Sequence, residues 1–264
     1  MNLLEEQLNA QKQKRDYAVV TVIKTDGSTP RHSGSKMMVF SDSSIIGTIG
    51  GGAIETLAIK DAVECINANS NSYKKYDLAP ENKDLSMACG GDMEVFIEVY
   101  RNKPLLVMCG AGHVGKALIQ LAKMLEFEVM LVDNRELSLI QDKIELADEF
   151  VPVDDFEEGV GGLEVDPGAY FVIATWGHKH DRYALKGALL KHAAYIGVIG
   201  SREKIAVMFD MMLKEGYSKE QLNDIYTPIG LDIGSETPME IALAIMAEIL
   251  CVKNNATGKS LKDL

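Results

Sequence analysis

The stretch Leu105-Leu-Val-Met-Cys-Gly-Ala-Gly-His-Val-Gly115 decides the fold of the second half of this chain. Its first five residues are apolar, which is typical of a strand buried on both faces of a parallel sheet. Three glycines with GxGxxG spacing follow at positions 110, 112 and 115, and an apolar periodicity then predicts a helix to about Leu125. This order matches the dinucleotide-binding fingerprint, whose glycines permit a tight turn, close approach of a pyrophosphate and helix–strand packing.

Strands and helices continue to alternate beyond this stretch. The short apolar segments Glu128–Val132, Ala169–Thr175 and Ala194–Ile199 predict further strands, with helical patterns between them. Such alternation indicates a doubly wound parallel sheet. The segment Thr237-Pro-Met-Glu240 predicts the start of a last helix, since it places a capping threonine, a proline and a glutamate at the positions where they stabilise a helix start. We therefore expect an α/β fold with a Rossmann-like domain over residues 104–264.

The first hundred residues follow a different pattern. After a leucine-spaced helix to about Arg15, the apolar run Tyr17–Ile23 predicts a buried strand, and Lys24–Arg31 has the composition of a loop. A helix is expected from about Ala53 to Ile66. Four further segments predict a hairpin and two more strands: Lys36–Phe40, Ser44–Ile49, Tyr73–Leu78 and Asp92–Tyr100. The polar segment Arg101–Pro104 predicts a domain boundary, so residues 1–100 are expected to form a small α+β domain.

Composition excludes several classes of protein. The chain has 264 residues, of which 47% are hydrophobic and 25% charged, as in an ordinary globular protein. No run approaches the roughly 18 apolar residues of a membrane span, and the mixed-charge N-terminus does not resemble a signal peptide, so we expect a cytoplasmic protein without a membrane partner. The net charge of −12 opposes binding to nucleic acid. Four cysteines without CxxC spacing suit neither a disulfide framework nor a zinc ribbon.

The glycine turn is the first candidate binding site. Free N–H groups and the positive end of the helix dipole at Gly110, Gly112 and Gly115 favour a phosphate group. His113 is a candidate phosphate contact, or else a solvated residue at the helix start. Asp133 stands at the end of the second strand, where an acidic residue can bind a ribose hydroxyl. These residues indicate a bound nucleotide of some kind, and the alternative is a Rossmann scaffold that no longer binds one.

Two more polar segments follow later strands, where ligands bind in open α/β sheets. Thr175-Trp-Gly-His178-Lys-His-Asp181 offers Thr175, His178 and Asp181 as ligand contacts, and His178 and Asp181 as candidate catalytic residues, either as an acid–base pair or as metal ligands. The alternative is a helix cap with surface histidines. Ser201 and Arg202 follow the predicted strand Ala194–Ile199 and predict an anion pocket at a helix start, or else ordinary capping with exposed bases.

Loops of the first domain combine glycine, hydroxyl and basic residues that suit an anionic ligand, although the glycines could equally serve only as turns. The candidates are Ser28, Thr29, Arg31, Gly50, Gly51, Gly52 and Glu55. Cys89 is flanked by Ala88 and two glycines, so its thiol is a candidate catalytic group, metal ligand or sulfur carrier. The alternative is a small buried hydrophobe, which is the interpretation we give to Cys65, Cys109 and Cys251.

Together these motifs resemble the xanthine dehydrogenase accessory factor (XdhC/CoxI) family over nearly the whole chain. The segments that resemble it are Gly27–Arg31, Gly34–Met37, Gly47–Gly52 with Glu55, Cys89–Gly91, Gly110–His113, Val132–Arg135, Thr175–Asp181, Tyr195–Arg202, Pro228–Gly234 and Thr237–Ala242. Many short motifs in one order are far more specific than the glycine fingerprint alone. Trp176 departs from the polar residues expected at its position.

The resemblance implies a chaperone rather than a catalyst. Such a protein would bind molybdenum cofactor (molybdopterin), protect it during sulfuration and help insert it into xanthine dehydrogenase or a related molybdenum hydroxylase. A cysteine desulfurase and a second copy of the chain are the other implied partners, and Cys89 matches the position of a molybdenum or sulfur contact. Two alternatives remain open: an NAD(P)-dependent oxidoreductase, and a regulatory module that senses a nucleotide.

Overall fold

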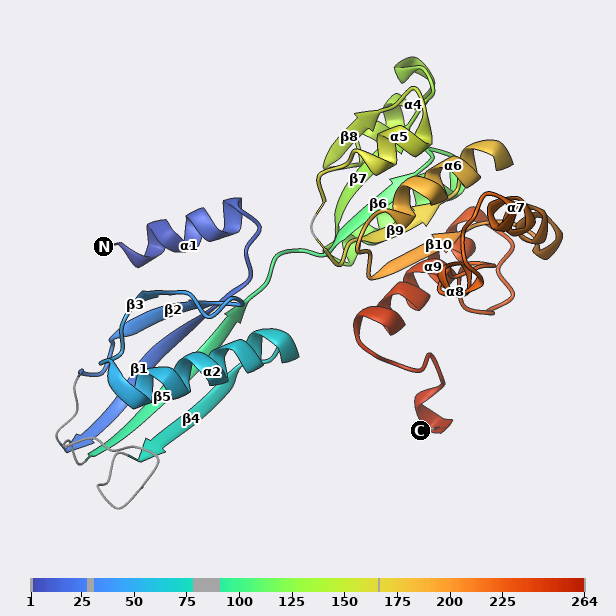
Figure 1. Ribbon diagram of the computed structural model, residues 1–264. Coiled ribbons are helices and arrows are strands. Elements are labelled where there is room, and N and C mark those ends of the chain that lie inside the picture. The colour runs from blue at the N-terminus through green and yellow to red at the C-terminus, as the bar shows by residue number, and fades with distance from the viewer. Residues whose placement is uncertain (1, 28–30, 78–90, 166, 264) are drawn as a thin grey trace. The chain divides into compact units, whose positions relative to one another are not determined.

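The computed structural model describes residues 2–27, 31–77, 91–165 and 167–263. The chain divides into two compact units, residues 1–102 and residues 103–264, each with its own hydrophobic core (Figure 1). In the described part of the chain no helix is long and apolar enough to cross a membrane.

The first unit is built on an antiparallel sheet. Its elements are α1 (Leu3–Lys12), β1 (Tyr17–Gly27), β2 (Lys36–Phe40), β3 (Ile45–Gly47), α2 (Gly52–Ala68), β4 (Ser72–Asp77) and β5 (Gly91–Tyr100). The strand order is β3-β2-β1-β5-β4, so the first and last strands of the unit pair at its centre. Side chains alternate between the two faces. Ala18 and Val20 pack under α2, whereas Tyr17 and Val19 pack with Ala10 of α1 on the opposite face.

One prediction for this unit is wrong. The segment Lys24–Gly27, expected to be loop, continues β1 and pairs with β5 beyond a register shift between Val22 and Lys24. Its polar, turn-forming residues are held in the strand by the ladder of hydrogen bonds to the ten-residue β5, so tertiary pairing overrides local propensity. The predicted hairpin of β2 and β3 is confirmed, with β3 shorter than the expected Ser44–Ile49.

The second unit contains the parallel sheet that the sequence predicts. Its strands are β6 (Leu105–Cys109), β7 (Glu128–Asp133), β8 (Glu149–Pro152), β9 (Tyr170–Ile173) and β10 (Tyr195–Val198). The order is β10-β9-β6-β7-β8 and every pairing is parallel. From β6 the chain adds β7 and β8 on one side and then returns to add β9 and β10 on the other side. The order reverses between β6 and β9, and ligands of open α/β sheets bind at the carboxyl ends of the two strands at such a switch point.

Helices cover both faces of this sheet, as Figure 1 shows. They are α3 (His113–Met124), α4 (Leu137–Ile144), α5 (Phe156–Gly161), α6 (His178–Leu189), α7 (Arg202–Lys214), α8 (Lys219–Asn223) and α9 (Pro238–Lys253), with a final 3-10 turn at Leu261–Asp263. Leu106 and Met108 pack with α3 and α9, whereas Val107 and Cys109 pack with α5, α6 and α7. The predicted capping box at Thr237 and Glu240 is confirmed. Sequence patterns had not located β8, a short edge strand without a fully buried residue.

Candidate functional site

The glycine turn after β6 lies directly against the segment that follows β9. Gly110 has φ of +112°, and its N–H donates to the carbonyl of Val132 over 2.9 Å. A Cβ at this position would lie 2.3 Å from the carbonyl oxygen of Ala174 and 2.8 Å from the Cα of Thr175. Gly115 is equally constrained, since its Cβ would lie 2.3 Å from the carbonyl oxygen of Gly110. Both glycines are therefore required by close packing within the protein.

Gly112 differs from these two glycines because nothing lies within 4 Å of the place where its Cβ would stand. It is the N-cap residue of α3 and offers no side chain to cap that helix. Within the described part of the chain, no acceptor binds the N–H groups of Gly112, His113 and Val114. Unpaired N–H groups at the positive end of a helix, beside an unobstructed glycine, suit a phosphate group. His113 is exposed and is the first residue of this helix, which fits the alternative of a solvated helix start.

Asp133 accepts several hydrogen bonds at this site. Its side chain is fully buried, and one oxygen accepts from the N–H of Ala111 over 2.6 Å. Arg135 approaches both oxygens, with Nε at 2.9 Å and Nη2 at 2.7 Å, and its backbone N–H also donates to the carboxylate. Burial alone would raise the pKa of Asp133, but the hydrogen bonds from Arg135 and Ala111 outweigh it and hold that pKa below its usual value.

This network bears on the prediction that Asp133 binds a ribose. Both carboxylate oxygens already have donors, so a ribose hydroxyl would have to displace Arg135 or Ala111. The visible role of the carboxylate is to tie the glycine turn to the loop after β7. Ribose binding by Asp133 stays a prediction without support from this geometry.

The segment after β9 is organised around Asp181. The carboxylate of Asp181 is buried and accepts from the backbone N–H of Thr175 at 2.9 Å and from its Oγ1 at 2.6 Å. Oγ1 of Thr175 also lies 3.1 Å from the carbonyl oxygen of Gly177, just before α6 begins. These contacts fix the course of residues 175–177. They give Asp181 a structural role, although not that of a helix cap, because Gly177 is the N-cap residue of α6 and no side chain caps this helix. The side chain of His178 lies outside the described residues.

Trp176 and Asn134 connect two of these loops, and sequence patterns did not single them out as a pair. The indole Nε1 donates to Oδ1 of Asn134 over 2.8 Å, although the two residues are 42 positions apart. The indole also lies against the ring of His180, with centroids 4.4 Å apart, and Trp176 is still 60% exposed. Only the adjacency of β6 with both β7 and β9 brings these loops together, so no local pattern could have revealed the contact.

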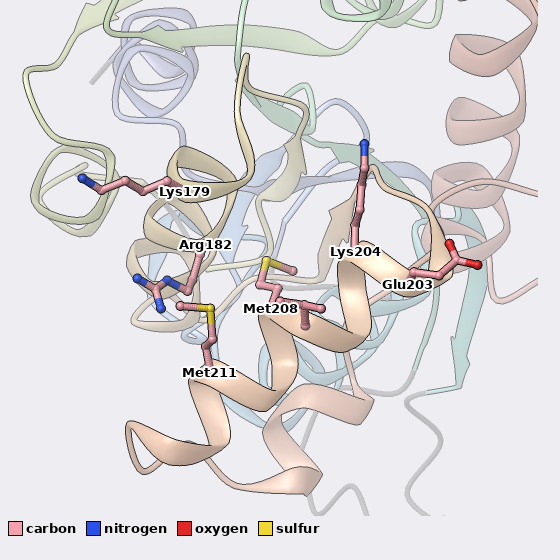
Figure 2. Close-up of a pocket in the computed structure, with 7 residues that line it drawn as sticks. Lys179, Arg182, Glu203, Lys204, Met208 and Met211 are labelled. Carbon is pink, nitrogen blue, oxygen red and sulfur yellow. The ribbon is translucent and has the colours of Figure 1, made fainter.

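The segment after β10 forms a conventional helix start. Ser201 caps α7 by accepting from the N–H of Lys204, and Arg202 is exposed. A groove of about 490 Å³ lies between α6 and α7, with Lys179 and Lys204 at its edge (Figure 2). Its lining includes the apolar side chains of Val207, Met208 and Met211, together with Arg182 and Glu203. The geometry thus supports ordinary capping with exposed bases rather than a closed anion pocket at Ser201.

In the first unit, the three consecutive glycines form a turn that already contains an anion. All three have positive φ, and α2 begins at Gly52. Oε2 of Glu55 accepts from the N–H groups of Ile49 and Gly51 at 3.1 Å each and from the hydroxyl of Thr48. The carboxylate of Glu55 therefore binds the backbone of this turn, at the place where the sequence predicted an external anion.

The remaining predicted residues are only partly described. Arg31 is exposed, and Ser28, Thr29 and Cys89 lie outside the described residues. Cys65 and Cys109 are buried, as predicted, and burial raises the pKa of both thiols, so neither is an activated nucleophile. Cys251 is partly exposed. Among the described residues, no three His, Cys, Asp or Glu side chains gather to form a metal site.

Fold and site together define a Rossmann-type protein with an uncapped glycine turn at the start of α3. Comparison with known families is consistent with this class. The sequence profile of the XdhC Rossmann domain matches residues 106–249, and that of the XdhC and CoxI family matches residues 10–77. The first match alone spans more than half of the chain. The chain therefore belongs to the XdhC and CoxI family, as its motifs predicted.

Three curated proteins are similar in sequence. Uncharacterized protein YqeB of Escherichia coli (strain K12) is 34% identical over 259 residues, which cover 98% of this chain and 47% of that protein. A probable xanthine dehydrogenase subunit of Bacillus subtilis (strain 168) is 28% identical over 59% of this chain and 45% of that protein. The chain thus spans about half the length of these two relatives. Molybdenum cofactor insertion chaperone PaoD of Escherichia coli (strain K12) is 20% identical, over 89% of this chain and 83% of that protein.

A solved structure shares the fold. A crystal structure described as a xanthine dehydrogenase from Bacillus halodurans superposes with a TM-score of 0.52 at 20% sequence identity. The superposition covers 97% of each chain. At this level of identity the likeness concerns the fold alone.

Proposed function

We propose that this chain binds molybdenum cofactor as cargo and supports its sulfuration and insertion into a molybdenum hydroxylase of the xanthine dehydrogenase type. Membership of the XdhC and CoxI family supports the proposal, as does the similarity to a relative described as a molybdenum cofactor insertion chaperone. On this proposal the chain is an accessory protein, and its partners are the hydroxylase, a cysteine desulfurase and a second copy of itself.

The observation that supports the proposal most directly is the open start of α3. Molybdenum cofactor contains a phosphate group, and the N–H groups of Gly112, His113 and Val114 have no acceptor among the described residues. Nothing lies within 4 Å of the place where a Cβ of Gly112 would stand. The starts of α7 and α9 lack this property, because Ser201 and Thr237 cap these helices with their own hydroxyls. A phosphate bound at α3 would leave the pterin and the metal end free to extend along the carboxyl edge of the sheet.

Cys89 is the proposed contact for sulfur or molybdenum. The other three cysteines are less suitable, since Cys65 and Cys109 are buried with raised pKa values and Cys251 belongs to α9. A thiolate between small residues can approach a soft metal centre.

The proposal is tested by purifying the chain from a molybdate-fed host and identifying the bound ligand by mass spectrometry. The expected ligand is molybdopterin or its nucleotide form, and the loaded protein should activate a cofactor-free xanthine dehydrogenase. Cys89→Ala should weaken cofactor retention or sulfuration, whereas the matched variant Cys251→Ala should behave like the wild type. Purified protein that neither contains nor accepts the cofactor would contradict the proposal.

The two nucleotide-based alternatives share the glycine turn but have less support. An NAD(P)-dependent oxidoreductase would use Asp133 for the ribose and an acid–base pair near Thr175, yet Asp133 is paired with Arg135 and Asp181 is paired with Thr175. Reduction of small carbonyl compounds with NAD(P)H would establish that activity. A nucleotide sensor would bind NAD or ATP without changing maturation of the target enzyme.

A further inference from the structure

The loops after β6, β7 and β9 form one connected edge of the second unit. The glycine turn contacts the loop after β7 through the hydrogen bond from Ala111 to Asp133. It contacts the segment after β9 through the close approach of Gly110 to Ala174. Trp176 then joins the two outer loops to each other through Asn134. A ligand bound at the start of α3 would therefore have Trp176 as a neighbour along this edge.

Trp176 is fixed in place yet exposed, an uncommon combination for a large apolar ring. The hydrogen bond to Asn134 and the contact with His180 restrict its side-chain rotation, and its 60% exposure leaves much of the ring available. His180 in turn packs against the buried ring of Phe156, with centroids 5.8 Å apart, so the support extends into the core. An aromatic ring that is already ordered loses little conformational entropy when a ligand packs on it.

We propose that Trp176 is a stacking platform for a flat, fused heteroaromatic ring, namely a pterin or a purine, of a ligand whose phosphate is bound at the start of α3. This inference rests on the proposed function, because the cofactor is one source of such a ring and a nucleotide is the other. Stacking suits this position, since every fused ring offers a π-face and an indole needs no defined hydrogen-bond partner to bind it.

The edge provides separate contacts for the two ends of such a ligand. The unpaired N–H groups at Gly112, His113 and Val114 would bind the phosphate, and they use backbone only. The indole side chain of Trp176 would bind the ring, and this side chain makes no contact with the phosphate in the proposed arrangement. The two contributions can therefore be removed one at a time, which makes the platform testable apart from the anion site.

Trp176 is also the only tryptophan of the chain, so its fluorescence reports on this position alone. The intact protein would be titrated with neopterin triphosphate, with ADP and with inorganic pyrophosphate, which has no ring. Binding would be followed by tryptophan emission and, independently, by calorimetry. We expect at least one ring-bearing probe to bind more tightly than pyrophosphate and to change the emission of Trp176. The probe that binds better identifies the source of the ring.

Substitution of Trp176 supplies the decisive comparison. Trp176→Ala should weaken binding of the ring-bearing probe by about 5- to 100-fold, the range expected for loss of one stacking contact. Trp176→Phe should retain most of that affinity, and pyrophosphate should bind both variants as it binds the wild type. Tyr73→Ala removes a similarly exposed aromatic ring from the first unit and serves as the matched control. Unchanged melting temperatures would show that these variants fold.

The proposal is overturned if Trp176→Ala binds the ring-bearing probe as tightly as the wild type does. It is also overturned if neither ring-bearing probe binds more tightly than pyrophosphate, or if calorimetry detects binding without a change in emission. These failures differ from failure of the proposed function, which is measured by cofactor retention and by maturation of the target enzyme in the wild-type protein.

Discussion

The two glycine-rich turns of this protein look alike in sequence and differ in what occupies them. At Gly50–Gly52 the carboxylate of Glu55 accepts from the backbone N–H groups of the turn, so the turn contains its own anion. At Gly110–Gly115 one N–H group binds Asp133, but those at the start of α3 have no partner in the described part of the chain. A glycine-rich helix start is therefore an anion site only where no neighbouring acid fills it.

The glycines of the second turn also differ from one another, since close packing requires two of them and leaves the third unobstructed. Gly110 and Gly115 leave no room for a Cβ, whereas Gly112 does. The contrast predicts a ranked series of effects on the free energy of unfolding, which chemical denaturation of the intact protein can measure.

The largest effect is expected for Gly110→Ala. The new Cβ would lie 2.3 Å from the carbonyl oxygen of Ala174, and φ of +112° is unfavourable for alanine. We expect a loss of about 4 kcal/mol from the second unit, in the range of severe core substitutions. The matched control is Gly112→Ala, whose new Cβ meets no atom within 4 Å. A loss below about 1 kcal/mol for Gly110→Ala would mean that the turn does not pack against β9 as described.

Asp133→Asn comes next. The substitution leaves the guanidinium of Arg135 without a carboxylate partner. It also places either an amide donor or a weaker, neutral acceptor against the N–H of Ala111. We therefore expect the free energy of unfolding to fall by about 3 kcal/mol. Asp142→Asn removes an exposed carboxylate paired with Lys116 and should cost much less. If the two variants lose the same stability, the Asp133 network is not a structural link between the loops.

The same network predicts a pH dependence. Because the pKa of Asp133 is lower in the folded protein than in the unfolded chain, its contribution to stability is complete above the unfolded pKa, about 4. It is lost as the pH falls through the folded pKa. Asp133→Asn should therefore lose less stability than the wild type between about pH 5 and pH 2. Parallel pH profiles for the two proteins would contradict this assignment.

Glu55→Gln should have an intermediate effect. The amide keeps one acceptor oxygen but removes the charge that binds Ile49, Gly51 and Thr48, so we expect a loss of about 1.5 kcal/mol from the first unit. Faster hydrogen exchange at the N–H groups of Ile49 and Gly51 would locate the effect. Glu64→Gln changes an exposed carboxylate of the same helix and is the matched control. Equal losses would show that Glu55 does not cap the turn.

The smallest effect on stability is expected for Gly112→Ala. Its φ of −76° is accessible to alanine and its Cβ meets open space, so the loss should stay within about 1 kcal/mol. Affinity for pyrophosphate should nevertheless fall, because the added methyl group occupies the space in front of α3. Unchanged pyrophosphate binding, measured by calorimetry, would place the anion elsewhere.

Much of the fold was predictable from particular residues. The alternation of apolar strands and helices predicted the parallel sheet, and Thr237 with Glu240 predicted the start of α9. Where prediction failed, long-range contacts decided the outcome. Lys24–Gly27 has loop composition but pairs with β5, and β8 is too short and too exposed to show an apolar pattern.

The candidate site was predictable in position but less so in the role of each residue. The sequence placed Gly110, Asp133, Thr175 and Ser201 at the carboxyl ends of strands, where the structure has them. It assigned Asp133 and Asp181 to a ligand, whereas their carboxylates bind Ala111, Arg135 and Thr175. The partners of a carboxylate depend on which loops the strand order brings together. That order cannot be read from local sequence patterns.

The two-part pattern of elements and the positions of the glycine turns could be read from the amino-acid sequence, because they follow from local spacing and periodicity. The family was indicated by the resemblance of many short motifs in one order. Only the folded chain shows that Glu55 fills one turn while no described residue fills the other, and that Trp176 meets Asn134 across 42 residues. The physical reason is that a backbone N–H group can be satisfied by any acceptor within about 3 Å. Only the folded chain determines which acceptors come that close.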